Sequence, residues 1–159
     1  AVTALRFNFR GVGRSQGSHS GGHGEQEDVR AALDFITAQK GVASKRLGLA
    51  GYSFGAMVAV PVAAADMRVC GAAAISLPLD PPGLEPWRDY RRPKLLICGA
   101  QDTYISVAEF ERLASELPDP KEYVVIPGAD HFWWMHEAEV APRTADFFVG
   151  VLGQTKSTV

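Results

Sequence analysis

The sequence predicts an α/β fold: a mostly parallel sheet of about five strands with helices on both of its faces. Short apolar runs alternate with amphipathic helical patterns, as in folds where a helix connects two parallel strands. Several of these runs are apolar almost throughout, as expected for strands covered on both faces. A length of 159 residues suits one domain, over 1–159, and is too short for two.

Five runs have the length and composition of strands. Each is rich in apolar residues and is bounded by glycine, proline or polar residues. The predicted strands are 2–9, 46–51, 70–77, 94–99 and 122–126.

Four segments have the pattern of helices. In the first, apolar residues recur at i, i+3, i+4 and i+7 from Val29 to Ile36, and acidic residues fill the first turn. Pro61 lies inside the second, where we expect a kink or an early end. The predicted helices are 25–39, 54–64, 107–117 and 142–152.

The remaining segments are irregular. Residues 11–24 are rich in glycine and serine and predict a mobile loop with little to pack. Residues 78–93 contain five prolines and predict a stiff excursion over the sheet edge. We expect the tail 154–159 to be frayed.

Composition restricts the class of protein. Hydrophobic residues make up 47% of the chain and charged residues 21%, which excludes general disorder. The net charge is −2, no basic cluster suits nucleic acid, and no apolar run approaches the length of a membrane span. Cys70 and Cys98 lie in apolar runs, as buried thiols do in a reducing compartment. We therefore expect a cytoplasmic protein without nucleic-acid or membrane partners.

One motif indicates a nucleophile. Gly51-Tyr52-Ser53-Phe54-Gly55 has the pattern Gly-x-Ser-x-Gly and lies between a predicted strand and a predicted helix. A serine on such a sharp turn has a strained backbone, and we expect that only glycine two residues on either side leaves room for it. The turn places the hydroxyl at a helix N-terminus, where backbone N–H groups favour negative charge.

A nucleophilic serine needs a base, and the base needs an orienting acid. Asp102 follows the strand at 94–99, and His131 follows the strand at 122–126. The carboxyl ends of parallel strands meet at one edge of the sheet, so Ser53, Asp102 and His131 can converge there. The sequence predicts that they form a catalytic triad.

Several alternatives stay open. Asp102 could instead cap the helix that follows it, and Asp130 or Asp80 could be the acid of the triad. His131 could be a plain surface histidine. We expect His136 to lie on a helix face.

Four aromatic residues are candidates for the substrate pocket because they flank the predicted site. Aromatic rings in these positions could form the wall of the acyl or leaving-group site, or they could pack in the core. They are Tyr52, Trp87, Trp133 and Trp134.

The motifs in combination resemble a known family. Residues 7–17, 24–28, 51–55, 99–102 and 128–132 are similar to those of small bacterial serine hydrolases, a branch of the α/β-hydrolase superfamily related to dienelactone hydrolases. The resemblance extends from residue 2 to about residue 152 and includes the order Ser, Asp, His. It implies that the Phe54 N–H helps to form the oxyanion hole. Dienelactone hydrolases carry a cysteine where this chain has Ser53, so their activity is not implied.

The chain also departs from that family. Members of the branch begin with three further strands and a loop that supplies the second oxyanion-hole donor, and this chain contains none of these. The third of those strands would lie between 2–9 and 46–51. We therefore expect an α/β-hydrolase core that lacks its N-terminal strands, with unpaired strand edges. Self-association or a missing N-terminal segment would provide partners for these unpaired edges. We expect one of these two rather than a slide of residues 2–9 onto 46–51.

The resemblance and the motifs together predict a function. We expect a carboxylesterase-like serine hydrolase that acts on esters of short acyl chains, without a metal or organic cofactor. The alternatives are a weakly active or inactive module that retains the fold, and thioester hydrolysis, peptide hydrolysis or perhydrolysis by the same triad.

Overall fold

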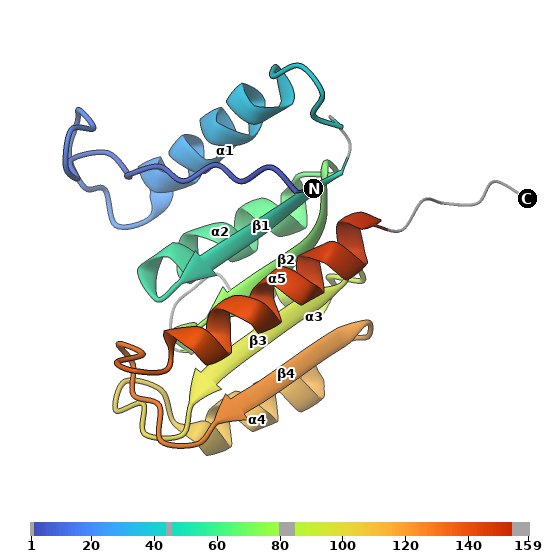
Figure 1. The fold of residues 1–159 in the computed structure, drawn as a ribbon. Helices are drawn as coiled ribbons and strands as arrows, with labels where there is room; N and C mark the ends of the chain where they lie inside the picture. Colours follow the sequence, from blue (N-terminus) through green and yellow to red (C-terminus); the bar gives the residue numbers. More distant parts are fainter. Residues whose placement is uncertain (1, 44–45, 80–84, 154–159) are drawn as a thin grey trace, which may run out of the picture.

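A computed structural model of the chain describes residues 2–43, 46–79 and 85–153 and contains a parallel sheet. Its strands lie in the order β1-β2-β3-β4, and each pairs in parallel with the next (Figure 1). The α/β fold predicted from the sequence is therefore confirmed, although the described residues form four strands rather than five. The strands are β1 (Leu47–Tyr52), β2 (Val69–Ile75), β3 (Lys94–Gly99) and β4 (Lys121–Ile126).

Residues 2–9 run beside β1 without joining the sheet (Figure 1). The prediction of a strand at 2–9 is therefore wrong for this structure, and so is the alternative that 2–9 slides onto β1. A groove of about 950 Å³, lined by residues 2–7 on one side and β1 on the other, separates the two segments. An extended segment becomes a strand only when its backbone finds a hydrogen-bonding partner, and the groove keeps β1 out of reach.

Helices cover both faces of the sheet, as predicted. α5 lies across one face, and α2 and α4 lie on the opposite face (Figure 1). α2 continues past Pro61, so of the two expected outcomes, a kink or an early end, the early end is wrong. α5 begins before the predicted start and contains Pro142. The helices are α1 (His23–Thr37), α2 (Phe54–Ala65), α3 (Glu85–Arg88), α4 (Val107–Glu116) and α5 (Glu137–Gly153).

The core consists of two apolar clusters, one on each face of the sheet. Alternate residues of β3 point to opposite faces, so Leu96 and Cys98 join one cluster while Leu95 and Ile97 join the other. All four side chains are buried. This arrangement explains why β3 is apolar throughout, and it supports a rigid sheet beneath the loops at the carboxyl ends of the strands.

The described part of the proline-rich segment belongs to the core. Trp87 is 1% exposed and Tyr90 is 3% exposed; their rings stack at 5.9 Å and belong to the same apolar cluster as α2. The predicted excursion over the site is therefore wrong for residues 85–93. Burial of these two large rings in the core stabilises the fold more than their exposure above the sheet edge would. Residues 80–84 and the tail 154–159 lie outside the described residues.

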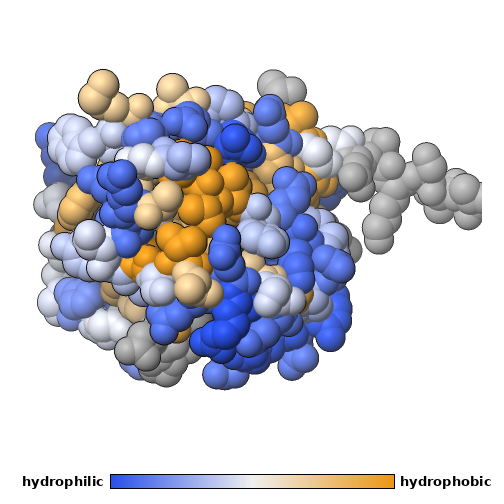
Figure 2. All heavy atoms as spheres, turned by 90° about the horizontal axis from the view of Figure 1, so that it is seen from below, coloured by the Kyte–Doolittle hydropathy of each residue, from blue (hydrophilic) through white to orange (hydrophobic). Residues whose placement is uncertain are grey.

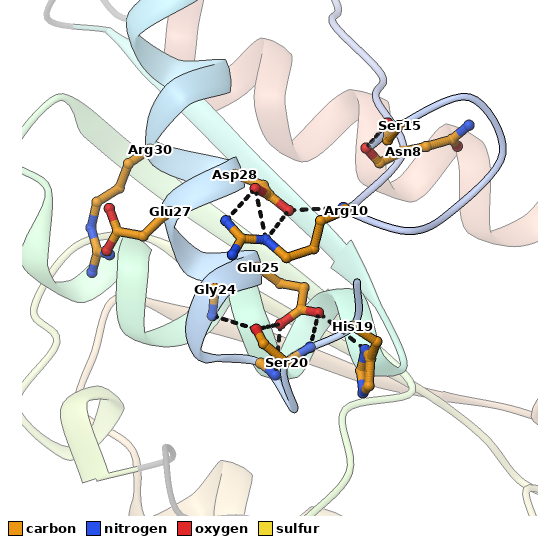
Figure 3. A network of polar contacts seen from close by, with 11 residues as sticks. Asn8, Arg10, Ser15, His19, Ser20, Gly24, Glu25, Glu27, Asp28 and Arg30 are labelled. Carbon is orange, nitrogen blue, oxygen red and sulfur yellow. Dashed lines mark hydrogen bonds and ion pairs between the residues drawn. The ribbon is translucent and has the colours of Figure 1, made fainter. Parts of the chain in front are cut away.

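The glycine-rich loop 11–24 is anchored rather than loose. The Glu25 carboxylate is fully buried and accepts hydrogen bonds from the backbone N–H and hydroxyl of Ser20 and from the N–H of Gly22 (Figure 3). Burial alone raises the pKa of Glu25, but these hydrogen bonds outweigh it and lower the pKa to about 2. The carboxylate thus ties the end of the loop to the first turn of α1, against the prediction of a loop with little to pack.

A second carboxylate fixes the start of the same loop. Asp28 accepts hydrogen bonds from the backbone N–H of Arg10 and from its guanidinium group (Figure 3). The ring of Phe9 then meets the ring of Phe54 edge to face at 5.8 Å. This contact connects the segment 2–9 to the residue that follows Ser53.

Candidate active site

Ser53 occupies a strained turn between β1 and α2. Its backbone has φ 50° and ψ −118°, a conformation that costs energy for a residue with a side chain. Its N–H donates to Ile75 O at 2.9 Å, which holds the turn against the end of β2. The turn therefore presents the hydroxyl at the carboxyl edge of the sheet and at the N-terminus of α2.

The two glycines of the motif differ in their importance for this turn. A Cβ atom at Gly51 would lie 2.3 Å from Gly55 O and 2.6 Å from Ala56 Cα, which is too close for any side chain. A Cβ at Gly55 would meet nothing within 4 Å. Steric crowding therefore explains Gly51, and the prediction that Gly55 is needed for room is wrong.

The structure brings Ser53, His131 and Asp102 into one line of hydrogen bonds. Ser53 Oγ lies 2.9 Å from His131 Nε2, and His131 Nδ1 lies 2.8 Å from Asp102 Oδ2. The side chain of His131 is 9% exposed and that of Asp102 is fully buried. The three residues follow β1, β4 and β3, so their meeting results from the parallel order of the strands.

Both oxygens of Asp102 have defined partners. Oδ2 faces His131, while Oδ1 accepts from the N–H groups of Tyr104 at 2.9 Å and Ile105 at 3.1 Å. These contacts hold the carboxylate in one orientation. The N-cap of α4 is Ser106, which accepts from the N–H of Glu109, so Asp102 does not cap that helix.

The alternative acids have different surroundings. Asp130 Oδ1 accepts from the N–H of Phe132 at 3.0 Å in a local turn. Asp80 lies outside the described residues. His136 lies just before α5, and its Nδ1 pairs with Glu139 Oε1 at 2.8 Å.

The surroundings of Ser53 distinguish it from Cys98, a second nucleophilic residue near this edge. The first N–H groups of a helix have no partner within the helix, and in α2 these include the N–H of Phe54. They can stabilise an oxyanion formed at Ser53. Cys98 is buried in β3, and burial, together with the charge of Asp102, raises the pKa of its thiol to about 12. That thiol stays protonated and is unsuited to attack.

The four pocket candidates separate into two pairs. Tyr52 is 44% exposed and its hydroxyl donates to His131 O at 2.9 Å; Trp134 is 72% exposed. Trp87 is a core residue, as described above. Trp133 is 6% exposed, belongs to the cluster beneath α5 and donates from Nε1 to Ser76 Oγ at 3.2 Å. The prediction of a pocket wall is therefore wrong for Trp87 and Trp133, whose rings pack in the interior.

Sequence reasoning missed two aromatic residues beside the histidine. The ring of Tyr104 lies 4.7 Å from the His131 ring, and the ring of Phe132 lies 5.6 Å from it. Both are close in sequence to triad candidates, because Tyr104 is two residues after Asp102 and Phe132 follows His131 directly. This proximity was the signal that could have identified them.

Within residues 2–43, 46–79 and 85–153, no group of three or more His, Cys, Asp or Glu side chains is placed to hold a metal ion. Over the same residues, no helix is long and apolar enough to cross a membrane.

Comparison with known proteins identifies the fold family and close structural neighbours. The family profile described as an alpha/beta hydrolase domain matches residues 1–145. An uncharacterized protein of Rickettsia prowazekii is 32% identical over 160 residues, which cover 94% of this chain and 66% of the relative.

Two solved structures are similar over most of the chain. A serine hydrolase homologue from Coxiella burnetii has a TM-score of 0.80 and 31% identity, covering 89% of this chain and 66% of its own. A lid-less serine hydrolase from Xanthomonas campestris has a TM-score of 0.80 and 30% identity, covering 94% of this chain and 67% of its own. The chain thus spans about two thirds of the length of each of these relatives.

Proposed function

The chain belongs to the alpha/beta hydrolase family, and we propose that it cleaves carboxylic esters with short acyl groups by means of Ser53, His131 and Asp102. The observation that supports this most is the line of two hydrogen bonds from Ser53 Oγ through His131 to Asp102. It joins a nucleophile, a base and an orienting acid, and it begins at a strained turn beside a helix N-terminus.

The proposed reaction begins with attack of Ser53 Oγ on the ester carbonyl, while His131 Nε2 accepts the hydroxyl proton. Asp102 accepts from His131 Nδ1–H, which keeps Nε2 unprotonated before the attack and stabilises the imidazolium after it. His131 then donates the proton to the leaving alkoxide, which leaves as the alcohol. Water activated by His131 hydrolyses the acyl-enzyme and releases the acid.

The oxyanion is stabilised by the N-terminus of α2. The N–H of Phe54, directly after the nucleophile, is the donor that we assign to the developing negative charge. Loss of one oxyanion-hole donor costs about 10²–10³ in turnover. A chain with Phe54 as its one donor would therefore be a weak esterase, which makes a weakly active module the second candidate function.

A fluorophosphonate probe tests the proposed function directly, because it reacts with activated serines and not with ordinary ones. We expect labelling of Ser53, located by peptide mass spectrometry, and slow hydrolysis of p-nitrophenyl acetate that exceeds hydrolysis of the octanoate. Heat-unfolded protein is the control, since it keeps every serine but loses the triad. Absence of labelling in the folded protein would reject the triad and leave the inactive module.

The 159-residue chain, produced alone, is expected to self-associate. β1 and β4 are the two edge strands of the described sheet, and β1 borders the groove of about 950 Å³. On the face seen from below in Figure 2, an apolar area is surrounded by hydrophilic side chains. Unpaired strand edges and exposed apolar surface both favour association with a second copy. Light scattering at micromolar concentration should give a mass above 17.1 kDa; a monodisperse monomer would contradict this.

A further inference from the structure

We propose that Tyr52, Tyr104 and Phe132 form a stacking surface that selects esters carrying an aromatic ring. We refer to these three residues as the aromatic rim. The proposal rests on the proposed ester hydrolysis and names a substrate class for the same site. It goes beyond that function because it assigns specificity to residues that take no part in the chemistry.

The aromatic rim surrounds the ring of His131. The ring centroids of Tyr104, Tyr52 and Phe132 lie 4.7, 5.6 and 5.6 Å from that of His131. Tyr104 and Phe132 also meet each other edge to face at 6.1 Å. A substrate whose carbonyl reaches Ser53 must therefore place a neighbouring group close to these rings.

Hydrogen bonds made around the triad hold the aromatic rim in position. The N–H of Tyr104 donates to Asp102, and the hydroxyl of Tyr52 donates to the backbone carbonyl of His131. The N–H of Phe132 donates to Asp130. These bonds fix the ring of Tyr52 and the backbone that carries Tyr104 and Phe132, so less freedom is lost when a substrate binds, which favours affinity.

The turn after His131 places one of its aromatic side chains in the core and leaves two exposed to solvent. Trp133 has φ 63° and Met135 has φ 64°, conformations that are uncommon for residues with side chains. Trp133 is buried by this turn, whereas Phe132 stays 58% exposed and Trp134 stays 72% exposed. Strained backbone conformations are common at functional sites, and large aromatic rings that stay exposed often mark binding surfaces. Both features occur together in this turn.

The charges near the aromatic rim further restrict the esters that can bind. Two carboxylates accept hydrogen bonds from the backbone of the aromatic rim: Asp102 from the N–H of Tyr104 and Asp130 from the N–H of Phe132. Burial, with the charges of Asp102 and Asp130, raises the pKa of Tyr52, which agrees with a negative local potential. An anionic ring would be repelled, so the selected esters are neutral.

Two pairs of esters matched in size test the proposal. Benzyl acetate and cyclohexylmethyl acetate both release a primary alcohol and differ in the aromaticity of the ring; methyl phenylacetate and methyl cyclohexylacetate place the same difference on the acyl side. We expect the chain to prefer the aromatic member of at least one pair in kcat/KM. Tyr104→Leu should reduce that preference by about two- to tenfold, the range for one aromatic contact. Tyr104→Phe should retain it.

Tyr123→Leu is the matched control. Tyr123 is 49% exposed, lies on β4, and its ring faces Phe110 rather than His131. The Tyr123→Leu substitution should leave the preference for the aromatic ester unchanged. If Tyr104→Leu and Phe132→Leu leave the ratio of the two esters as it is in the unsubstituted chain, the aromatic rim has no role in specificity.

A binding measurement separates this proposal from the proposed function. Ser53→Ala protein can hold an ester without cleaving it, and saturation-transfer NMR can compare its binding of benzyl acetate and cyclohexylmethyl acetate. Stronger binding of benzyl acetate, lost on adding Tyr104→Leu, supports the aromatic rim even if no ester is hydrolysed. Equal binding of benzyl acetate and cyclohexylmethyl acetate, together with equal binding of methyl phenylacetate and methyl cyclohexylacetate, overturns it, whether or not the chain is an esterase.

Discussion

Replacement of Ser53 by alanine is expected to abolish ester hydrolysis and to leave the melting temperature nearly unchanged. Alanine keeps the Cβ atom and removes the hydroxyl, whose partner in the structure is His131 Nε2. The precedent for removing the serine of a triad is a loss of about 10⁶ in kcat. If the chain is a weak esterase, this loss brings it to the background rate.

Turnover of p-nitrophenyl acetate and a thermal melt on the same samples measure the two effects. Ser115→Ala is a suitable control, because Ser115 is an exposed serine of α4 whose hydroxyl donates to a carbonyl of its own helix. His131→Ala should be about as severe as Ser53→Ala, and the double variant should be no worse, since the residues act as one unit. Esterase activity that persists in purified Ser53→Ala protein would show that another group is the nucleophile.

The triad geometry could be predicted from the sequence because it depends on strand order more than on detail. Ser53, Asp102 and His131 each follow an apolar run, and parallel strands bring their carboxyl ends to one edge. The strand ends were predicted to within two residues, which was enough to place the three side chains. No knowledge of how the helices pack was needed.

The errors concern properties that depend on neighbours far away in the sequence. Trp87 and Trp133 have the same aromatic character as an exposed wall residue, and only the space beneath α2 and α5 places them in the core. Residues 2–9 have strand composition, but pairing requires a partner that composition cannot reveal. Gly55 fits the motif, yet only coordinates show that a Cβ there would be in open space.

The polar contacts that anchor the loop 11–24 could not be predicted from the sequence either. Glu25 and Asp28 were assigned to the first turn of a helix, where a carboxylate favours the helix dipole. The structure shows that they also bind the loop 11–24 and Arg10 (Figure 3). Two carboxylates thus hold the glycine-rich loop, Glu25 through Ser20 and Gly22 at its end and Asp28 through Arg10 at its start.

The second large effect is expected from Asp102→Asn, which should reduce kcat by about 10⁴, as in the serine-protease precedent. Oδ1 of Asp102 accepts from the N–H groups of Tyr104 and Ile105, so an asparagine would keep its oxygen there. Its NH₂ group would then face His131 Nδ1 and donate to it. The imidazole would carry its proton on Nε2 and could no longer accept the proton of Ser53.

The matched comparison is Asp130→Asn, measured with the same ester and at the same pH as Asp102→Asn. Asp130 accepts from the N–H of Phe132, a contact that an asparagine oxygen can preserve, so we expect a far smaller loss. Asp80→Asn is expected to be similarly mild. Both substitutions keep the size of the side chain, and a thermal melt would show whether folding is affected. If Asp130→Asn or Asp80→Asn proves the more damaging change, the orienting acid is not Asp102, and its hydrogen bond to His131 serves the fold rather than the reaction.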